Sequence, residues 1–123
     1  MRDHETAMQV YVQLAAESHR KKQPLVRDRF LLLGGVEACR AGWLDVADLC
    51  REKIAASNPA HQVGHFPTMA DALRDEDFQN VVAHWERWCP FEKAEAMLRK
   101  LKLPAKPAND QTVGEQMRSL LNE

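Results

Sequence analysis

The sequence lacks the features that mark several large classes of protein. It has 123 residues, of which only 5 are Gly and 6 are Pro, and 45% are hydrophobic. This composition is outside the range of low-complexity and disordered chains. No apolar run approaches the roughly 20 residues that a membrane-spanning helix needs. The formal net charge is -1, so the chain has no general basic excess of the kind that polyanion-binding proteins carry.

Cysteine is also scarce, and its pattern excludes a disulfide framework. Cys39, Cys50 and Cys89 are odd in number, scattered, and never paired as CxxC. We therefore predict buried free thiols in a reducing compartment. The amino-terminal residues MRDHET lack the apolar core of a signal peptide, so the expected location is the cytoplasm.

Catalytic and metal-binding motifs are absent as well. There is no HExxH, no GxSxG and no glycine-rich phosphate loop, and each of these would be needed for its own chemistry. His61 and His65 are four residues apart, but they lie in a segment rich in Pro and Gly and have no CxxC pair to complete a zinc site. We predict no catalytic residues, no metal and no cofactor, and hence a protein that is not an enzyme.

What the sequence does contain is helical periodicity along almost its whole length. The predicted fold is all-α, with five to six antiparallel helices in a repeat-like array or an irregular bundle. Pro24 suits the start of a helix and Gly42 its end. The other predicted caps share a short side chain that can accept a backbone N–H bond, and they are Thr6, Asp45, Thr68, Asp75 and Thr112.

The helix predicted over residues 24–42 has apolar residues on two faces and should lie at the centre of the core. One stripe holds Val26, Phe30 and Leu33, and the other holds Leu25 and Leu32 among its members. Gly34 and Gly35 interrupt this helix, and each costs about 1 kcal/mol relative to Ala. We expect the close approach of another helix to compensate for that cost.

The predicted domain organisation has three parts. Residues 1–103 form a single helical domain, residues 104–111 form a linker containing Pro104 and Pro107, and residues 112–123 form a short amphipathic helix. A helix this short must dock on its own domain or in the groove of a partner. The candidate partner-binding residues are the apolar stripe of this helix, Val113, Met117, Leu120 and Leu121.

The stretch from about residue 31 to residue 59 resembles one tetratricopeptide-type repeat. Its small, turn-forming and closing positions match at Gly35, Gly42, Ala47, Ile54 and Pro59. It departs from the pattern where Ala38 replaces the usual Tyr and Arg51 replaces a bulky aromatic residue, and no second repeat follows 34 residues later. The segment from VRDRF to NP is also similar to one found in small uncharacterised bacterial helical proteins. The resemblance implies a repeat-like helical hairpin.

Two functions of different classes follow from these observations. The leading hypothesis is a non-catalytic protein-interaction or adaptor domain, with another protein as its partner. The alternative is a nucleic-acid-associated regulator that uses a basic ridge near residues 93–106, formed by Lys93, Arg99, Lys100, Lys102 and Lys106. Trp85, Trp88 and Phe91 fall at core-like positions in the helical pattern, and Glu92 and Glu95 dilute the positive charge, which makes the alternative the weaker one.

Overall fold

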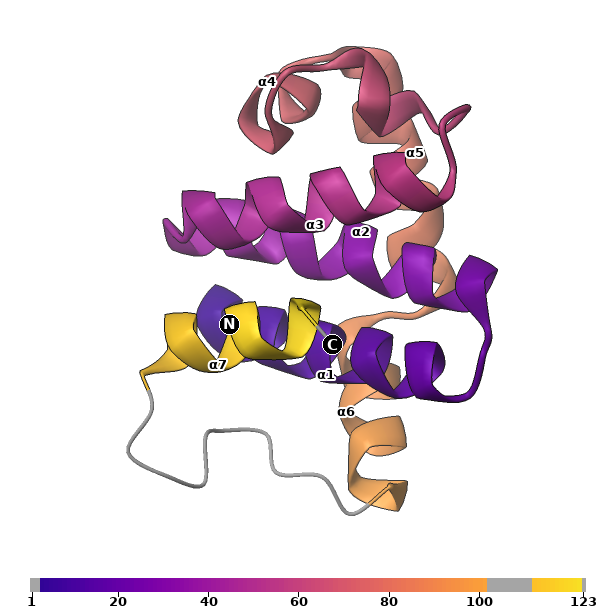
Figure 1. Ribbon diagram of the computed structural model, residues 1–123, viewed down its shortest axis with the longest axis vertical. Coiled ribbons are helices and arrows are strands. Elements are labelled where there is room, and N and C mark those ends of the chain that lie inside the picture. The colour runs from indigo at the N-terminus through magenta and orange to yellow at the C-terminus, as the bar shows by residue number, and fades with distance from the viewer. Residues whose placement is uncertain (1–2, 102–111, 123) are drawn as a thin grey trace.

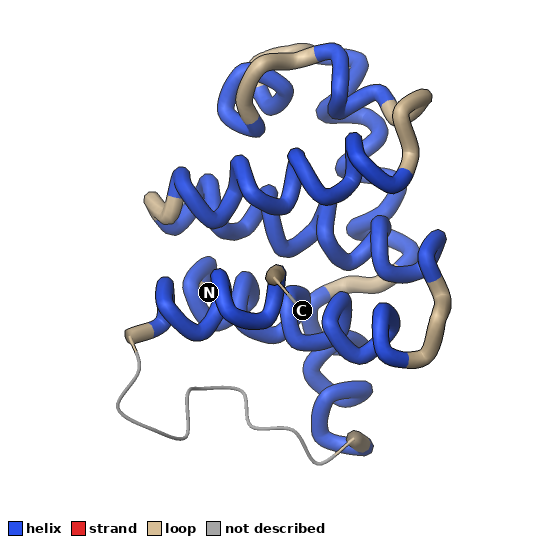
Figure 2. Tube along the Cα trace, viewed as in Figure 1, coloured by secondary structure: helices blue, strands red, loops and turns tan. Residues whose placement is uncertain are grey.

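The architecture is all-α, as the sequence predicts. The structure is a computed structural model that describes residues 3–101 and 112–122, and within these ranges it holds seven α-helices, one 3-10 helix and no strand (Figures 1 and 2). The elements are α1 (His4–Arg20), α2 (Pro24–Ala41), α3 (Leu44–Ser57), η1 (Gln62–His65), α4 (Met69–Leu73), α5 (Glu76–Trp88), α6 (Phe91–Lys100) and α7 (Val113–Leu121). The number of α-helices is therefore larger than the five to six expected. The predicted linker, residues 104–111, lies outside the described residues.

Helix α2 is the centre of the core, as its two apolar faces predict. It packs between α1 and α3, and the residues from Phe30 to Ala38 are all buried. Figure 1 shows α1 and α2 as one layer and α7 and α3 as a second layer in front of it. Helices α4 and α5 cover one end of these layers, while α6 packs against α1 at the other. Within the described residues, no helix is both long and apolar enough to cross a membrane.

The two adjacent glycines of α2 are sites of close helix approach, which confirms the sequence prediction. A Cβ atom on Gly34 would lie 3.4 Å from the backbone nitrogen of Val12 in α1. A Cβ atom on Gly35 would lie 2.9 Å from the Cβ of Cys50 in α3. Each glycine thus lets α2 approach a different neighbour, and the packing offsets the low helix propensity of the pair.

Most of the predicted helix boundaries are confirmed. Gly42 ends α2 in the left-handed conformation with φ +90°, and the N–H of Trp43 donates to the carbonyl oxygen of Ala38 at 2.8 Å. This is the bonding pattern of a Schellman cap. The side chains of Thr68, Asp75 and Thr112 cap α4, α5 and α7 by accepting backbone N–H bonds.

Two predicted caps are wrong. Helix α1 begins before Thr6, because the carboxylate of Asp3 accepts the N–H of Glu5 at 3.0 Å and the hydroxyl of Thr6 itself donates to Asp3. Helix α3 begins at Leu44, with Trp43 as its N-cap, so Asp45 lies inside the first turn. In that position the carboxylate of Asp45 accepts a bond from Arg118 in α7, a long-range contact that local capping rules do not include.

Candidate functional site

The C-terminal helix docks on its own chain in this structure. Helix α7 packs against α1 and α3, and it buries Met117 and Leu121 while Val113 and Leu120 are half-buried. Arg118 Nη1 lies 2.6 Å from Asp45 Oδ2. Only a small cavity of about 10 Å³ remains beside Leu120 and Leu121, which is at the lower limit for one water molecule. The four predicted partner-binding residues therefore face the core or its edge.

Gly114 and Trp43 form the tightest part of this docking surface. A Cβ atom on Gly114 would lie 2.6 Å from Cζ3 of the Trp43 ring. The indole is held from the other side, because its Nε1 donates to Glu5 Oε1 at 2.9 Å. The absence of a side chain at residue 114 thus lets α7 lie directly on the indole.

The basic ridge is only partly described, and its described part is partly neutralised. Lys93 donates to the carbonyl oxygen of Trp88 at the end of α5, and Arg99 pairs with Glu95 at 3.3 Å. Lys93 and Lys100 are exposed. Lys102 and Lys106 lie outside the described residues.

The histidines and cysteines form no metal-binding cluster in the part of the chain that the structure describes. No group of three or more His, Cys, Asp or Glu side chains is placed to hold a metal ion there. His61 and His65 line different hollows. The three thiols are free, and burial raises the pKa of Cys50 to about 12, so this residue is protonated and unreactive near neutral pH.

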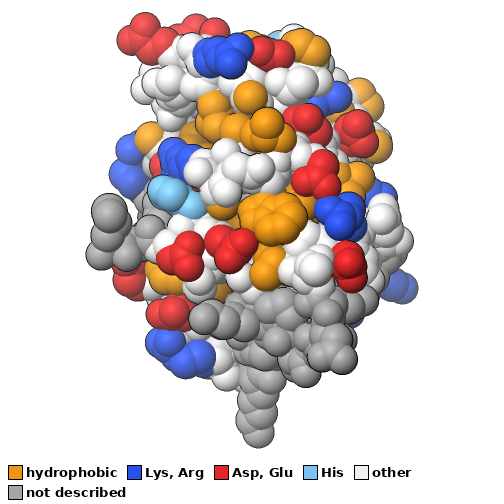
Figure 3. All heavy atoms as spheres, turned by 90° about the vertical axis from the view of Figure 1, so that its left-hand side faces the viewer, with side chains coloured by type: hydrophobic (Ala, Val, Ile, Leu, Met, Phe, Trp, Pro, Cys, Tyr) orange, Lys and Arg blue, Asp and Glu red, His pale blue; other side chains and the backbone are white. Residues whose placement is uncertain are grey.

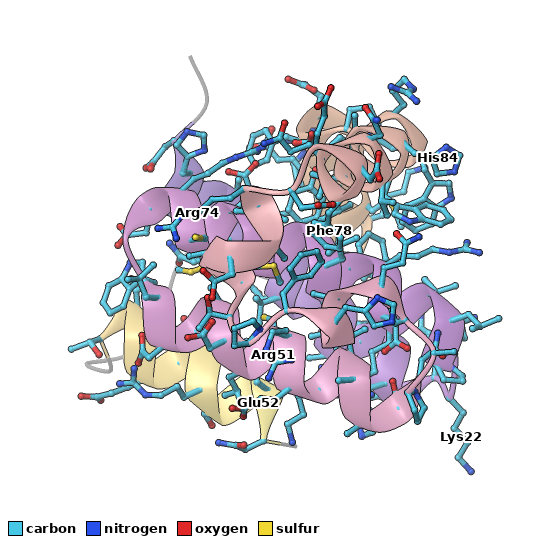
Figure 4. All side chains as sticks on the ribbon, turned by 90° about the horizontal axis from the view of Figure 1, so that it is seen from above. Lys22, Arg51, Glu52, Arg74, Phe78 and His84 are labelled. Atoms are coloured by element: carbon cyan, nitrogen blue, oxygen red, sulfur yellow. The ribbon has the colours of Figure 1, made fainter. Side chains whose placement is uncertain are left out.

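The candidate site is a pocket on the side of the molecule where α2 begins and α3 ends, at the right of Figure 1. Its volume is about 150 Å³. In Figure 4, Lys22 before α2 and His84 on α5 project outward on this side, whereas Phe78 points into the interior. We call it the Trp85 pocket, and it is lined by Leu25, Asp28, Arg29, Leu32, Asn58, His61 and Trp85.

Arg29 is the most distinctive group of the Trp85 pocket. The carbon of its guanidinium lies 4.6 Å from the ring centre of Trp85 and 5.2 Å from that of Trp88. These contacts are cation–π interactions, which hold the planar group in place. Among residues 3–101 and 112–122, no carboxylate pairs with Arg29. The pocket therefore presents a positioned cation whose hydrogen-bond donors are not used by a described carboxylate.

A ladder of aromatic rings ties this cation to the core. The ring centres of Trp85 and Trp88 are 5.8 Å apart, and Trp88 lies 5.2 Å from Phe30, which is buried. Phe30 in turn lies 6.4 Å from Tyr11 of α1, whose hydroxyl donates to the carbonyl oxygen of Cys89 at 2.9 Å. Because the inner rings are fixed by packing, the outer ring and the guanidinium on it have little freedom to rearrange.

Asp28 carries the negative charge of the pocket, and that charge is already compensated. Its side chain is buried, and its two oxygens lie 2.9 and 2.8 Å from the hydroxyl of Ser57, which can donate to one of them at a time. Arg27 Nη1 lies 3.9 Å from Asp28 Oδ1. A buried carboxylate needs such partners to stay charged. The lining of the pocket thus holds one carboxylate, Asp28, and one cation, Arg29, while Arg27, which lines another hollow, pairs with that carboxylate from outside the pocket.

His61 contributes a neutral hydrogen-bond donor. Its Nδ1 accepts the backbone N–H of Val63 at 3.0 Å, so in the neutral ring the proton is on Nε2. Burial lowers the pKa of His61, and the nearby carboxylate of Asp28 offsets only part of that effect. The imidazole is thus neutral at pH 7, and Nε2–H is its remaining donor.

Two larger hollows are less suited to bind a ligand. The first, of about 270 Å³, lies between α2, α4 and α5, but its charged groups Arg40 and Glu86 pair with each other at 3.1 Å. The second, of about 280 Å³, is lined by His65 and Phe66 among others, and its Asp75 is used to cap α5. Figure 3, which views the side opposite the Trp85 pocket, shows charged and apolar side chains interspersed.

The residues of the Trp85 pocket come from three separate segments of the chain, so no local sequence pattern predicts this site. The helical pattern assigns Leu25 to an apolar stripe, yet the structure leaves Leu25 66% exposed at the rim of the pocket. Trp85 was predicted to be a core residue and is half-buried. The available signal was the spacing of Leu25, Arg29 and Leu32, which places an arginine between two leucines on one helical face.

The fold and site define a small all-α protein with a pocket lined by an indole ring, an arginine and an aspartate. Comparison of the chain with protein-family models, with curated proteins and with solved structures finds no significant match. The tetratricopeptide-like character of residues 31–59 therefore stays a prediction, although Gly35 does contact the early part of α3 as that pattern requires.

Proposed function

We propose that this chain is a non-catalytic protein-interaction domain of the adaptor type and that it binds its partner at the Trp85 pocket. The observation that carries the proposal is the combination of Arg29, stacked on Trp85 without a described carboxylate partner, and the exposed side chain of Leu25 beside it. Arginine and tryptophan are the residue types most often found at the energetic centre of protein interfaces.

The rigidity of the pocket supports the same proposal. Arg29 loses little conformational freedom on binding because the two indoles already hold it. Leu25 supplies exposed apolar area next to that cation. A partner segment that covers Leu25 and reaches Arg29 would gain apolar burial and a charged contact together.

The test is affinity capture from lysate of the source cells with three forms of the full chain. Leu25→Ser changes the pocket rim. Leu44→Ser is the matched control, since Leu44 is the other large exposed apolar residue among those that the structure describes, at 53%, and belongs to α3 rather than to the pocket. We expect a stoichiometric protein partner that survives high salt, is lost with Leu25→Ser and is kept with Leu44→Ser. Recovery of nucleic acid that high salt removes would support the basic ridge instead. Equal capture by both variants would move the interface away from the pocket.

A further inference from the structure

The charges of the Trp85 pocket indicate which chemical group it binds. We infer that the pocket receives the carboxylate of an acidic side chain in a partner peptide, with an apolar residue next to it in the peptide packing on Leu25. This inference rests on the proposed function and specifies the ligand of the same site. It does not depend on the identity of the partner.

The charges at the pocket leave one cation without a carboxylate partner among the described residues. Asp28 is the carboxylate of the pocket, and it is compensated by the Ser57 hydroxyl and by Arg27 at 3.9 Å. Arg29 has no such partner among the described residues and adds one further positive charge. An incoming carboxylate would neutralise that charge, whereas an incoming ammonium group would add to it.

The pocket offers hydrogen-bond donors from two side chains, Arg29 and His61. The guanidinium of Arg29, whose carbon lies 4.6 Å from the ring centre of Trp85, is a planar group with N–H donors along its edges. His61 adds Nε2–H, because its Nδ1 is occupied by the N–H of Val63. A carboxylate accepts hydrogen bonds and donates none when ionised, so its needs match these donors.

The volume of the pocket and the leucines that line it fit an acidic side chain with an apolar neighbour. A pocket of about 150 Å³ has room for one side chain. Of the two leucines that line it, Leu32 is fully buried and Leu25 is exposed. An acidic side chain inside and an apolar side chain against Leu25 therefore fit as neighbours in one extended segment.

The experiment uses three blocked dipeptides as probes with the full chain: N-acetyl-Leu-Glu-amide, N-acetyl-Leu-Gln-amide and N-acetyl-Leu-Lys-amide. The blocked ends remove terminal charges, so the side chain is the only variable. Binding is followed by NMR at the indole N–H of Trp85 and the ring of His61. We expect the Glu probe to bind with millimolar affinity and about ten-fold more tightly than the Gln probe, since a charge-assisted hydrogen bond is stronger than a neutral one.

Variants assign the effect to Arg29. Arg29→Gln should remove the preference for Glu over Gln, and Arg29→Lys should weaken it, because lysine keeps the charge but not the planar group on the indole. Arg87→Gln is the matched control: Arg87 is an exposed cation on the same helix as Trp85 and does not line the pocket. This control should bind the Glu probe like the unaltered chain.

Three results would overturn the inference: equal binding of the Glu and Gln probes, tighter binding of the Lys probe, or no binding of the Glu probe at about 10 mM. None of them decides the proposed function, which depends on whether Leu25→Ser abolishes partner capture. If partner capture depends on Leu25 but the chain shows no preference for the Glu probe, the Trp85 pocket remains the interface and the proposed carboxylate ligand is wrong. If the chain prefers the Glu probe but captures no partner that depends on Leu25, the pocket binds a carboxylate and the proposed adaptor role is wrong.

Discussion

Gly35 is the residue at which one added methyl group should disturb the core most clearly. Its Cβ would lie 2.8 Å from Met69 Cε and 2.9 Å from Cys50 Cβ. The end of a methionine can move, but the Cβ of a cysteine on a packed helix cannot without moving α3. Overpacking of this kind typically costs about 1–3 kcal/mol, which exceeds the gain of about 1 kcal/mol in helix propensity.

We therefore predict that Gly35→Ala lowers the free energy of unfolding by up to about 2 kcal/mol after the gain in helix propensity, measured by chemical denaturation. Gly64→Ala is the matched control. The added Cβ would lie 3.7 Å from Ala55 Cβ, an ordinary contact, so its effect should stay within about 0.5 kcal/mol. Equal stability of the two variants would show that α2 and α3 are not in close contact at Gly35.

His61 should make the stability of the protein depend on pH. Burial lowers its pKa in the folded state below the ordinary value of 6.5, so the unfolded chain binds a proton more readily than the folded one. The contribution of His61 to stability is then fully present above pH 6.5, and it is lost as the pH falls from 6.5 toward the folded pKa. Above that range His61 adds no pH dependence.

The measurement compares the unaltered chain with His61→Asn between pH 7.5 and 5.5. Asparagine can still accept the N–H of Val63 through its side-chain oxygen but does not titrate. The free energy of unfolding of the unaltered chain should fall relative to that of the variant as the pH decreases. Parallel curves would contradict a half-buried His61 with a lowered pKa at the wall of the pocket.

Among the helices, α7 is held to the rest of the fold by contacts that single substitutions can test. Its Gly114 lies on the indole of Trp43, and its Arg118 pairs with Asp45. Gly114→Ala would place a Cβ 2.6 Å from the ring, and the indole is held in place by Glu5. The helix must therefore shift or detach, although alanine favours the helix itself.

We predict faster amide hydrogen exchange throughout α7 in Gly114→Ala, with slow exchange retained in α2. Ser119→Ala is the control, because Ser119 is exposed on the same helix and its replacement touches no packed neighbour. Unchanged exchange in Gly114→Ala would mean that α7 is not seated on Trp43. Such a result would favour docking of Val113, Met117, Leu120 and Leu121 on a partner.

The sequence predicts the helix boundaries better than the contacts between helices, because boundaries depend on nearby residues and contacts depend on packing. The end of α2 at Gly42 and the start of α5 at Asp75 depend on hydrogen bonds that span at most five positions, and the start of α2 depends on the fixed φ of Pro24. Local patterns therefore contain the information. Asp45 was predicted to be a cap because it has cap chemistry, but Arg118 binds its carboxylate from 73 residues away. The Trp85 pocket was missed for the same reason, since packing alone brings Arg29, His61 and Trp85 together.

At the scale of the whole molecule, the core and the candidate site are parts of one packed system. The aromatic ladder runs from Tyr11 in α1 through Phe30 and Trp88 to Trp85 at the surface. The pocket is thus fixed by the same rings that join α2 to α5. We expect binding there to change the backbone little, as in other preorganised interfaces.

An interface at the Trp85 pocket can be tested directly by photo-crosslinking in the source cells. The full chain would carry benzoylphenylalanine in place of Leu25 or, as the control, in place of Leu44, the two large exposed apolar side chains among the described residues. If the Trp85 pocket is the interface, the Leu25 position gives one discrete protein adduct, which Arg29→Ala in the same chain strongly reduces, and the Leu44 position does not give that adduct. The same adduct from both positions, or an adduct from the Leu25 position that is unaffected by Arg29→Ala, would contradict the account.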